Sequence, residues 1–194
     1  MTDDTASNAQ LFLSRIRDHY VEQLLLFVAE QRRNSIRGEA EVKLELEPGT
    51  MVFRSLSCAD FVRNEGEPEI IEFEPERILG FEPITATLGN AELEIENLRW
   101  DDVVIDHDGA FDAERILGAW FEKWFDPDDR RYRPGADLGN VIHSLVVEPG
   151  KLRIDFGSAS PDAFWELLDR VEKAGATELR ISSSQVDAAS ARPA

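Results

Sequence analysis

Cysteine and histidine are scarce in this chain, and their scarcity excludes several common kinds of site. The 194 residues include one cysteine, Cys58, so no disulfide can form within the chain and no CxxC pair is available. The three histidines, His19, His107 and His143, lie far apart, and no HExxH, GxSxG, Walker A or GxGxxG pattern occurs. These absences argue against the common hydrolases, kinases and dehydrogenases, and we expect no cofactor.

Basic residues and long apolar runs are also few. Acidic residues outnumber basic ones 39 to 21, which gives a formal net charge of −18. This charge repels nucleic acid and anionic membranes at long range, so we expect neither as a direct partner. The apolar run LLLFVA at 24–29 is far shorter than the ~20 residues of a membrane span, and the acidic start MTDDT is unlike a signal peptide. With a single cysteine, these features predict a cytoplasmic protein.

The apolar content is sufficient for a folded core, since 42% of the residues are hydrophobic and 11 are phenylalanine. Hairpin and helix signals alternate along the chain, which predicts an α+β fold with a largely antiparallel sheet and helices packed on one face. We expect a disordered lead at 1–8, one domain at 9–182 with candidate subdomains 9–90 and 91–182, and a disordered tail at 183–194.

Three segments alternate glutamate with apolar residues: EVKLELE at 41–47, EFEPE at 72–76 and ELEIE at 92–96. In strands, this alternation turns the apolar side chains inward and the glutamates outward. Residues 41–100 carry 14 acidic and 5 basic residues, the densest negative charge in the chain. We therefore expect an acidic face that binds a partner. Its residues are Glu72, Glu74, Glu92, Glu94 and Glu96.

A simpler interpretation of the same glutamates is a cross-strand ladder of ion pairs within the sheet. Lys43, Lys151, Arg153 and Arg180 fall on outward positions of predicted strands and are its candidate cations. Whether the glutamate face is unpaired or neutralised stays open at this point.

Local signals predict several elements. A long helix is expected at 11–33, a hairpin with strands 41–46 and 51–56 around Pro48-Gly49, and a loop at 57–69. Two further helices are expected after Asp112 and Ser160, which are typical N-cap residues. Around them, residues 92–125 and 140–175 resemble each other, with a constant offset of 50 residues between the two helices. This similarity predicts a tandem repeat of a β-hairpin followed by a helix.

Two further features are candidates for function. Asp106, His107 and Asp108 are weak candidates for a divalent metal site, although strand alternation would turn His107 away from the two aspartates. The alternative is a polar loop before a helix. Trp100 lies beside Arg99 at an expected hairpin tip, and we interpret it as an exposed aromatic anchor for a partner.

These observations favour a non-catalytic acidic binding protein of the bacterial cytoplasm. Its partner would be a basic protein, as for an immunity-type inhibitor or a nucleic-acid mimic. The first alternative is an enzyme with a carboxylate-rich, metal-assisted site near Asp106, His107 and Asp108. The second is a structural or adaptor subunit that docks through its N-terminal helix. The identity of the partner and the oligomeric state do not follow from the sequence.

Overall fold

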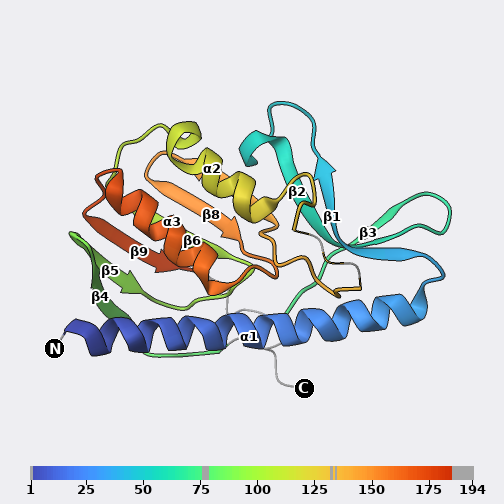
Figure 1. The fold of residues 1–194 in the computed structure, drawn as a ribbon, viewed down its shortest axis with the longest axis horizontal. Coiled ribbons are helices and arrows are strands. Elements are labelled where there is room, and N and C mark those ends of the chain that lie inside the picture. Colours follow the sequence, from blue (N-terminus) through green and yellow to red (C-terminus); the bar gives the residue numbers. More distant parts are fainter. Residues whose placement is uncertain (1, 76–78, 132, 134, 185–194) are drawn as a thin grey trace, which may run out of the picture.

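The computed structural model describes residues 2–75, 79–131, 133 and 135–184 (Figure 1). The helices are α1 (Thr2–Asn34), α2 (Ala113–Phe125) and α3 (Pro161–Lys173), with a short 3-10 helix, η1 (Phe53–Ser55). The strands are β1 (Gly38–Glu45), β2 (Leu56–Arg63), β3 (Glu69–Ile71), β4 (Ile84–Leu88), β5 (Ala91–Ile95), β6 (Val103–His107), β7 (Ser144–Glu148), β8 (Lys151–Asp155) and β9 (Glu178–Ser182).

The strands form two sheets. The first has the order β1-β2-β3 and is antiparallel, and the second has the order β4-β5-β9-β6-β8-β7 and is mixed, because β5 and β9 run parallel. Helices α2 and α3 lie together in front of the six-stranded sheet (Figure 1). The predicted α+β fold, with a largely antiparallel sheet and helices on one face, is confirmed.

Helices α2 and α3 begin where the local sequence predicts. The Asp112 carboxylate accepts a hydrogen bond from the backbone N–H of Arg115 and caps α2. Ser160 precedes α3 and Pro161 occupies its first turn, but the Ser160 hydroxyl makes no capping hydrogen bond. The apolar faces of both helices are buried, and Trp120 donates through Nε1 to the carbonyl of Ala163 at 2.9 Å.

Helix α1 runs along the whole molecule and contacts both sheets (Figure 1). It includes the predicted helix 11–33 and begins at Thr2, within the expected disordered lead. Its buried stripe, which includes Leu13, Tyr20 and Leu24, joins a single core cluster that also contains Cys58 of β2. Among the described residues, no helix is long and apolar enough to cross a membrane.

The first hairpin differs from the prediction in its second strand. This strand is β2 at Leu56–Arg63 rather than 51–56, and it occupies most of the segment expected as a loop. Both faces of β2 are buried, since the five consecutive residues 58–62 are all buried. The alternation of apolar and polar residues that would reveal a strand is therefore absent. Residues 72–75, expected as a strand, also lie outside any strand, since β3 ends at Ile71.

The predicted tandem repeat is not confirmed. The second unit exists, because β7 and β8 form an antiparallel hairpin that precedes α3. The first unit does not contain the expected hairpin, because β9 lies between β5 and β6 and pairs with both. The candidate subdomain boundary at 90/91 falls inside the β4-β5 hairpin. The tail expected at 183–194 lies outside the described residues after Ser184.

Candidate functional site

A groove of about 850 Å³ lies on the face of the six-stranded sheet that α2 and α3 leave open. Outward-facing residues of β4, β5, β6 and β9 line it, together with the turn at Gly150. The charged side chains of the lining are Glu92, Glu94, Asp106, Asp108, Glu178 and Arg180. Five carboxylates and one guanidinium give this lining a formal charge of −4.

Part of this charge is neutralised within the sheet, as the simpler interpretation predicted. The Arg180 guanidinium lies 2.9 Å from the Glu96 carboxylate and 3.7 Å from that of Glu94, and its pKa is raised, chiefly by the hydrogen bond to Glu96. Lys151 lies 3.3 Å from Asp106. The third candidate cation, Arg153, donates a hydrogen bond to Ser184.

Together with Asp108, which is held by hydrogen bonds from neutral donors, Glu92 and Glu178 carry the charge of the groove that no described cation neutralises. The two glutamates are register partners on the parallel strands β5 and β9, so their side chains are neighbours on the same face. No ion pair involves either of them within the part of the chain that the structure describes. Two like charges side by side are unfavourable, and a cation placed between them would relieve the repulsion.

The weak metal candidates line the same groove but have other roles. The Asp108 carboxylate accepts hydrogen bonds from the Thr177 hydroxyl and from the backbone N–H groups of Thr177 and Glu178, which lower its pKa to about 2. His107 stacks on Phe111, and burial lowers its pKa. The described residues contain no group of three or more His, Cys, Asp or Glu side chains placed to hold a metal ion.

The remaining predicted contact residues lie elsewhere. Glu72 and Glu74 follow β3 of the other sheet, so the five glutamates do not share one sheet face. Trp100 is only 1% exposed, because its ring packs against Phe156 and Phe164 in the core. The prediction that Trp100 is an exposed anchor for a partner is therefore wrong.

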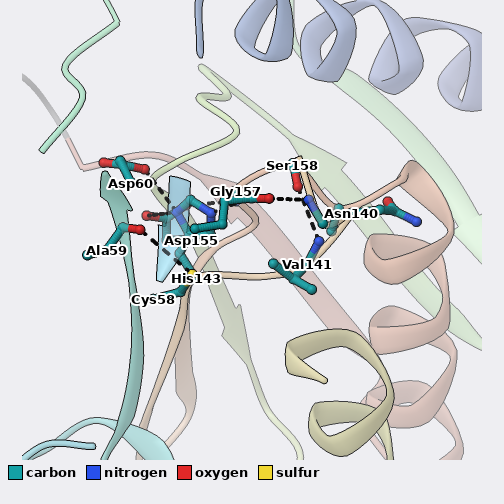
Figure 2. A network of polar contacts seen from close by, with 12 residues as sticks. Cys58, Ala59, Asp60, Asn140, Val141, His143, Asp155, Gly157 and Ser158 are labelled. Carbon is teal, nitrogen blue, oxygen red and sulfur yellow. Dashed lines mark hydrogen bonds and ion pairs between the residues drawn. The ribbon is translucent and has the colours of Figure 1, made fainter. Parts of the chain in front are cut away.

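A second cluster of charged side chains is buried where the two sheets meet, around His143 (Figure 2). Its Nε2 lies 2.9 Å from Glu41 Oε1, and its Nδ1 lies 3.0 Å from Asp60 Oδ1 and 3.8 Å from Asp155 Oδ2. The side chains of His143, Glu41 and Asp60 are at most 7% exposed, whereas that of Asp155 is 28% exposed. Asp155 therefore lies where the cluster reaches solvent.

The local backbone brings these groups together. In the β1-β2 ladder, Ala40 pairs with Phe61 and Val42 pairs with Ala59. Glu41 and Asp60 lie opposite each other between these two pairs, at the position where the regular strand pairing is interrupted. Glu41 has a φ of 52°, which is unusual for a residue other than glycine and lets the strand depart from regular pairing. Gly157, with a φ of 47°, lies against the imidazole, and a Cβ at this position would be 2.1 Å from His143 Cδ2.

Burial and charge shift the pKa values of the cluster in opposite directions. Burial alone would lower the pKa of His143, but its acidic neighbours raise it well above the ordinary range. Burial opposes ionisation of Glu41 and Asp60, yet their contacts with His143 lower both pKa values. Burial raises the pKa of Asp155 to about 7. Nearby, burial raises the pKa of the Cys58 thiol to about 12, so this thiol is not an activated nucleophile.

Neither the family models, nor the curated proteins, nor the solved structures contain a match to this chain. The function must therefore be inferred from the groove and the cluster themselves.

Sequence reasoning missed the His143 cluster. Strand alternation predicts an outward position for Glu41, and Asp60 falls in the segment predicted as a loop. His143 is separated from Glu41 by 102 positions. One signal was available, because an isolated histidine between Val141-Ile142 and Leu145 lies within an apolar segment, and a histidine in such a place requires polar partners.

Proposed function

We propose that the protein is a non-catalytic binding protein whose acidic groove receives a lysine- or arginine-rich segment of a basic partner protein. The observation that carries the proposal is the groove lining, in which Glu92 and Glu178 lie side by side without a counterion among the described residues. An immunity-type inhibitor or a nucleic-acid mimic would use such a surface. The proposal includes a cytoplasmic location, which a single, buried cysteine supports, since disulfides are rare in reducing compartments.

The groove suggests the form of the partner segment. It extends over four neighbouring strands, β4, β5, β9 and β6. Strands lie 4.7–4.9 Å apart, so the groove is about 14 Å across, which is the length of roughly four residues of extended chain. Because Arg180 already pairs with Glu94 and Glu96, we expect the partner's cations to lie over Glu92 and Glu178. Such binding weakens as salt rises, since exposed charges are screened.

Charge reversal in the groove tests this proposal. A fluorescent octalysine peptide is titrated against the wild type and the double variant Glu92→Lys/Glu178→Lys, with fluorescence anisotropy as the measurement. We expect the variant to bind at least tenfold more weakly at low salt, and the difference to shrink as salt is added. Thermal unfolding of both proteins verifies that the variant remains folded.

The matched control separates the groove from the overall charge. Glu22 and Glu30 are exposed on α1, and reversing both to lysine changes the net charge by the same amount. We expect this control to bind the peptide within about threefold of the wild type. Equal weakening in both double variants would show that the peptide responds only to net charge, and the proposal would be rejected.

A further inference from the structure

The residue His143 connects the two sheets through its backbone. Its carbonyl accepts a hydrogen bond from the N–H of Cys58 on β2, and its own N–H donates to the carbonyl of Asp155 on β8, both at 2.8 Å. The chain at His143 therefore lies between a strand of the three-stranded sheet and a strand of the six-stranded sheet (Figure 2).

The side chain of His143 also connects the two sheets, through ion-pair contacts. Glu41 and Asp60 come from β1 and β2, and they contact opposite nitrogens of the imidazole at 2.9 and 3.0 Å. The contact of Nε2 with Glu41 is a hydrogen bond, and that of Nδ1 with Asp60 is an ion-pair contact. An ionised carboxylate attracts only a ring nitrogen that carries a proton, so both nitrogens must be protonated for both contacts to be favourable. If one proton leaves, a nitrogen lone pair faces a carboxylate in a site from which water is largely excluded, and the contact becomes repulsive.

We propose that His143 and its carboxylates form a proton-dependent joint, which holds the three-stranded sheet against the six-stranded sheet while His143 is protonated and loosens when the proton is lost. Other polar links between the two parts include ion pairs near the surface, for example those of Lys43 with Asp129 and of Arg54 with Glu114, and the backbone bridge of Val52 with Val146. Loosening of the joint can therefore open β1 and β2 locally, while β9 stays paired with β5 and β6.

The charged and titratable groups around the joint come from several elements. They are Tyr20 of α1, Glu41 and Lys43 of β1, Cys58 and Asp60 of β2, Glu72 after β3, Asp101 before β6 and Asp155 of β8. Burial raises the pKa values of Tyr20 and Cys58, which keeps both neutral near pH 7, so the ionised carboxylates, chiefly Glu41 and Asp60, favour a positive charge on the imidazole.

The direction of the pH dependence follows from two raised pKa values. The pKa of His143 is higher in the folded protein than its ordinary value of 6.5, so the stability it contributes is complete below pH 6.5 and is lost as the pH rises through the folded value. The pKa of Asp155 is raised from 3.8 to about 7, so its contribution to stability is also lost as the pH rises, between pH 3.8 and about 7. Glu41 and Asp60, whose pKa values are lowered, lose their contribution only in acid.

Hydrogen–deuterium exchange tests the joint in the intact protein. Peptides covering β1 and β2 are compared with peptides covering β9 between pH 6 and the pH at which the imidazole of His143 has lost its proton, after division by the intrinsic exchange rates. We expect the protection of β1 and β2 to fall at least tenfold over this range while that of β9 is maintained. Constant protection in β1 and β2, or an equal fall in both sheets, would overturn the proposal.

Two variants assign the effect to His143. In His143→Gln the side chain cannot become charged, so we expect low protection of β1 and β2 at every pH. In the matched control His107→Gln, which alters a histidine outside the joint, the wild-type pH dependence should remain.

A measurement on the wild type keeps the proposal testable if His143→Gln does not fold. The imidazole ¹⁵N chemical shifts of His143 are followed over the same pH range, with His19 and His107 as internal references. The proton of His143 should be lost above pH 6.5, in step with the loss of protection. A neutral His143 throughout the range would refute the joint.

Discussion

Replacing Asp155 with asparagine should stabilise the protein near neutral pH, although it removes a charge beside a protonated histidine. The Asp155 carboxyl is largely surrounded by protein, and burial raises its pKa from 3.8 to about 7. An amide resembles the neutral acid in shape and can still accept the hydrogen bond that the Gly157 N–H donates to Asp155 Oδ1 at 2.8 Å. The substitution therefore removes the unfavourable ionisation and keeps the local geometry.

The size of the effect follows from the shift in pKa. A group with a raised folded pKa contributes full stability below its unfolded value, and this contribution is lost as the pH rises to the folded value. For Asp155 the window runs from pH 3.8 to about 7, with a tenfold change in the unfolding equilibrium for each pH unit. The total is about 4 kcal/mol as an upper limit, because the side chain is 28% exposed and is partly hydrated.

Urea unfolding of the wild type and Asp155→Asn at pH 5, 6, 7 and 8 measures this effect. We expect the variant to be the more stable protein, by a margin that grows from pH 5 to pH 7 and then levels off. Asp169→Asn, which removes a surface carboxylate paired with Lys173, serves as the control and should show no such dependence. A margin that is the same at all four pH values, or a variant that is less stable at pH 8, would contradict the reasoning.

Three further predictions concern the surroundings of the two sites. Gly157→Ala should lower the free energy of unfolding by about 1–3 kcal/mol, because its Cβ overlaps the His143 ring, whereas Gly80→Ala, with no atom nearby, should change little in thermal unfolding. Cys58 should react with iodoacetamide at least a hundredfold more slowly in the folded protein than in urea, since it is buried and its pKa is about 12; rapid labelling of the native protein would disprove this. Asp108→Ala should reduce the melting temperature at pH 7. The reduction should become smaller as the pH falls from 3.8 toward 2, because the stability that the ionised Asp108 carboxylate contributes is lost when it is protonated. A reduction of the melting temperature that does not depend on pH would contradict this prediction.

The features that the sequence predicts well depend on near neighbours in the chain. The start of α2 is an example, since the Asp112 carboxylate accepts from an N–H three residues away. The β7-β8 hairpin also follows from strand alternation on either side of a short turn. In each case the partners are fixed by the period of the helix or the strand.

The features that the sequence does not predict depend on residues far apart in the chain. Glu41 follows the alternation of an outward residue, but its positive φ and the approach of His143 bury it. Trp100 is covered by Phe156 and Phe164, which come more than fifty residues later. The position of β2 was missed because both of its faces are buried, so its apolar residues show no period. Such contacts are set by the tertiary fold and leave no local pattern.

The position of β9 has a consequence for the order of folding. β9 is the last strand in the described sequence, yet it is a central strand of its sheet, with β5 on one side and β6 on the other. During synthesis, β5 and β6 leave the ribosome more than seventy residues before their common neighbour, and until it arrives each has an unpaired edge exposed to other chains. Closure of the sheet therefore depends on contacts distant in sequence, which slows folding and makes the unfinished chain prone to aggregation.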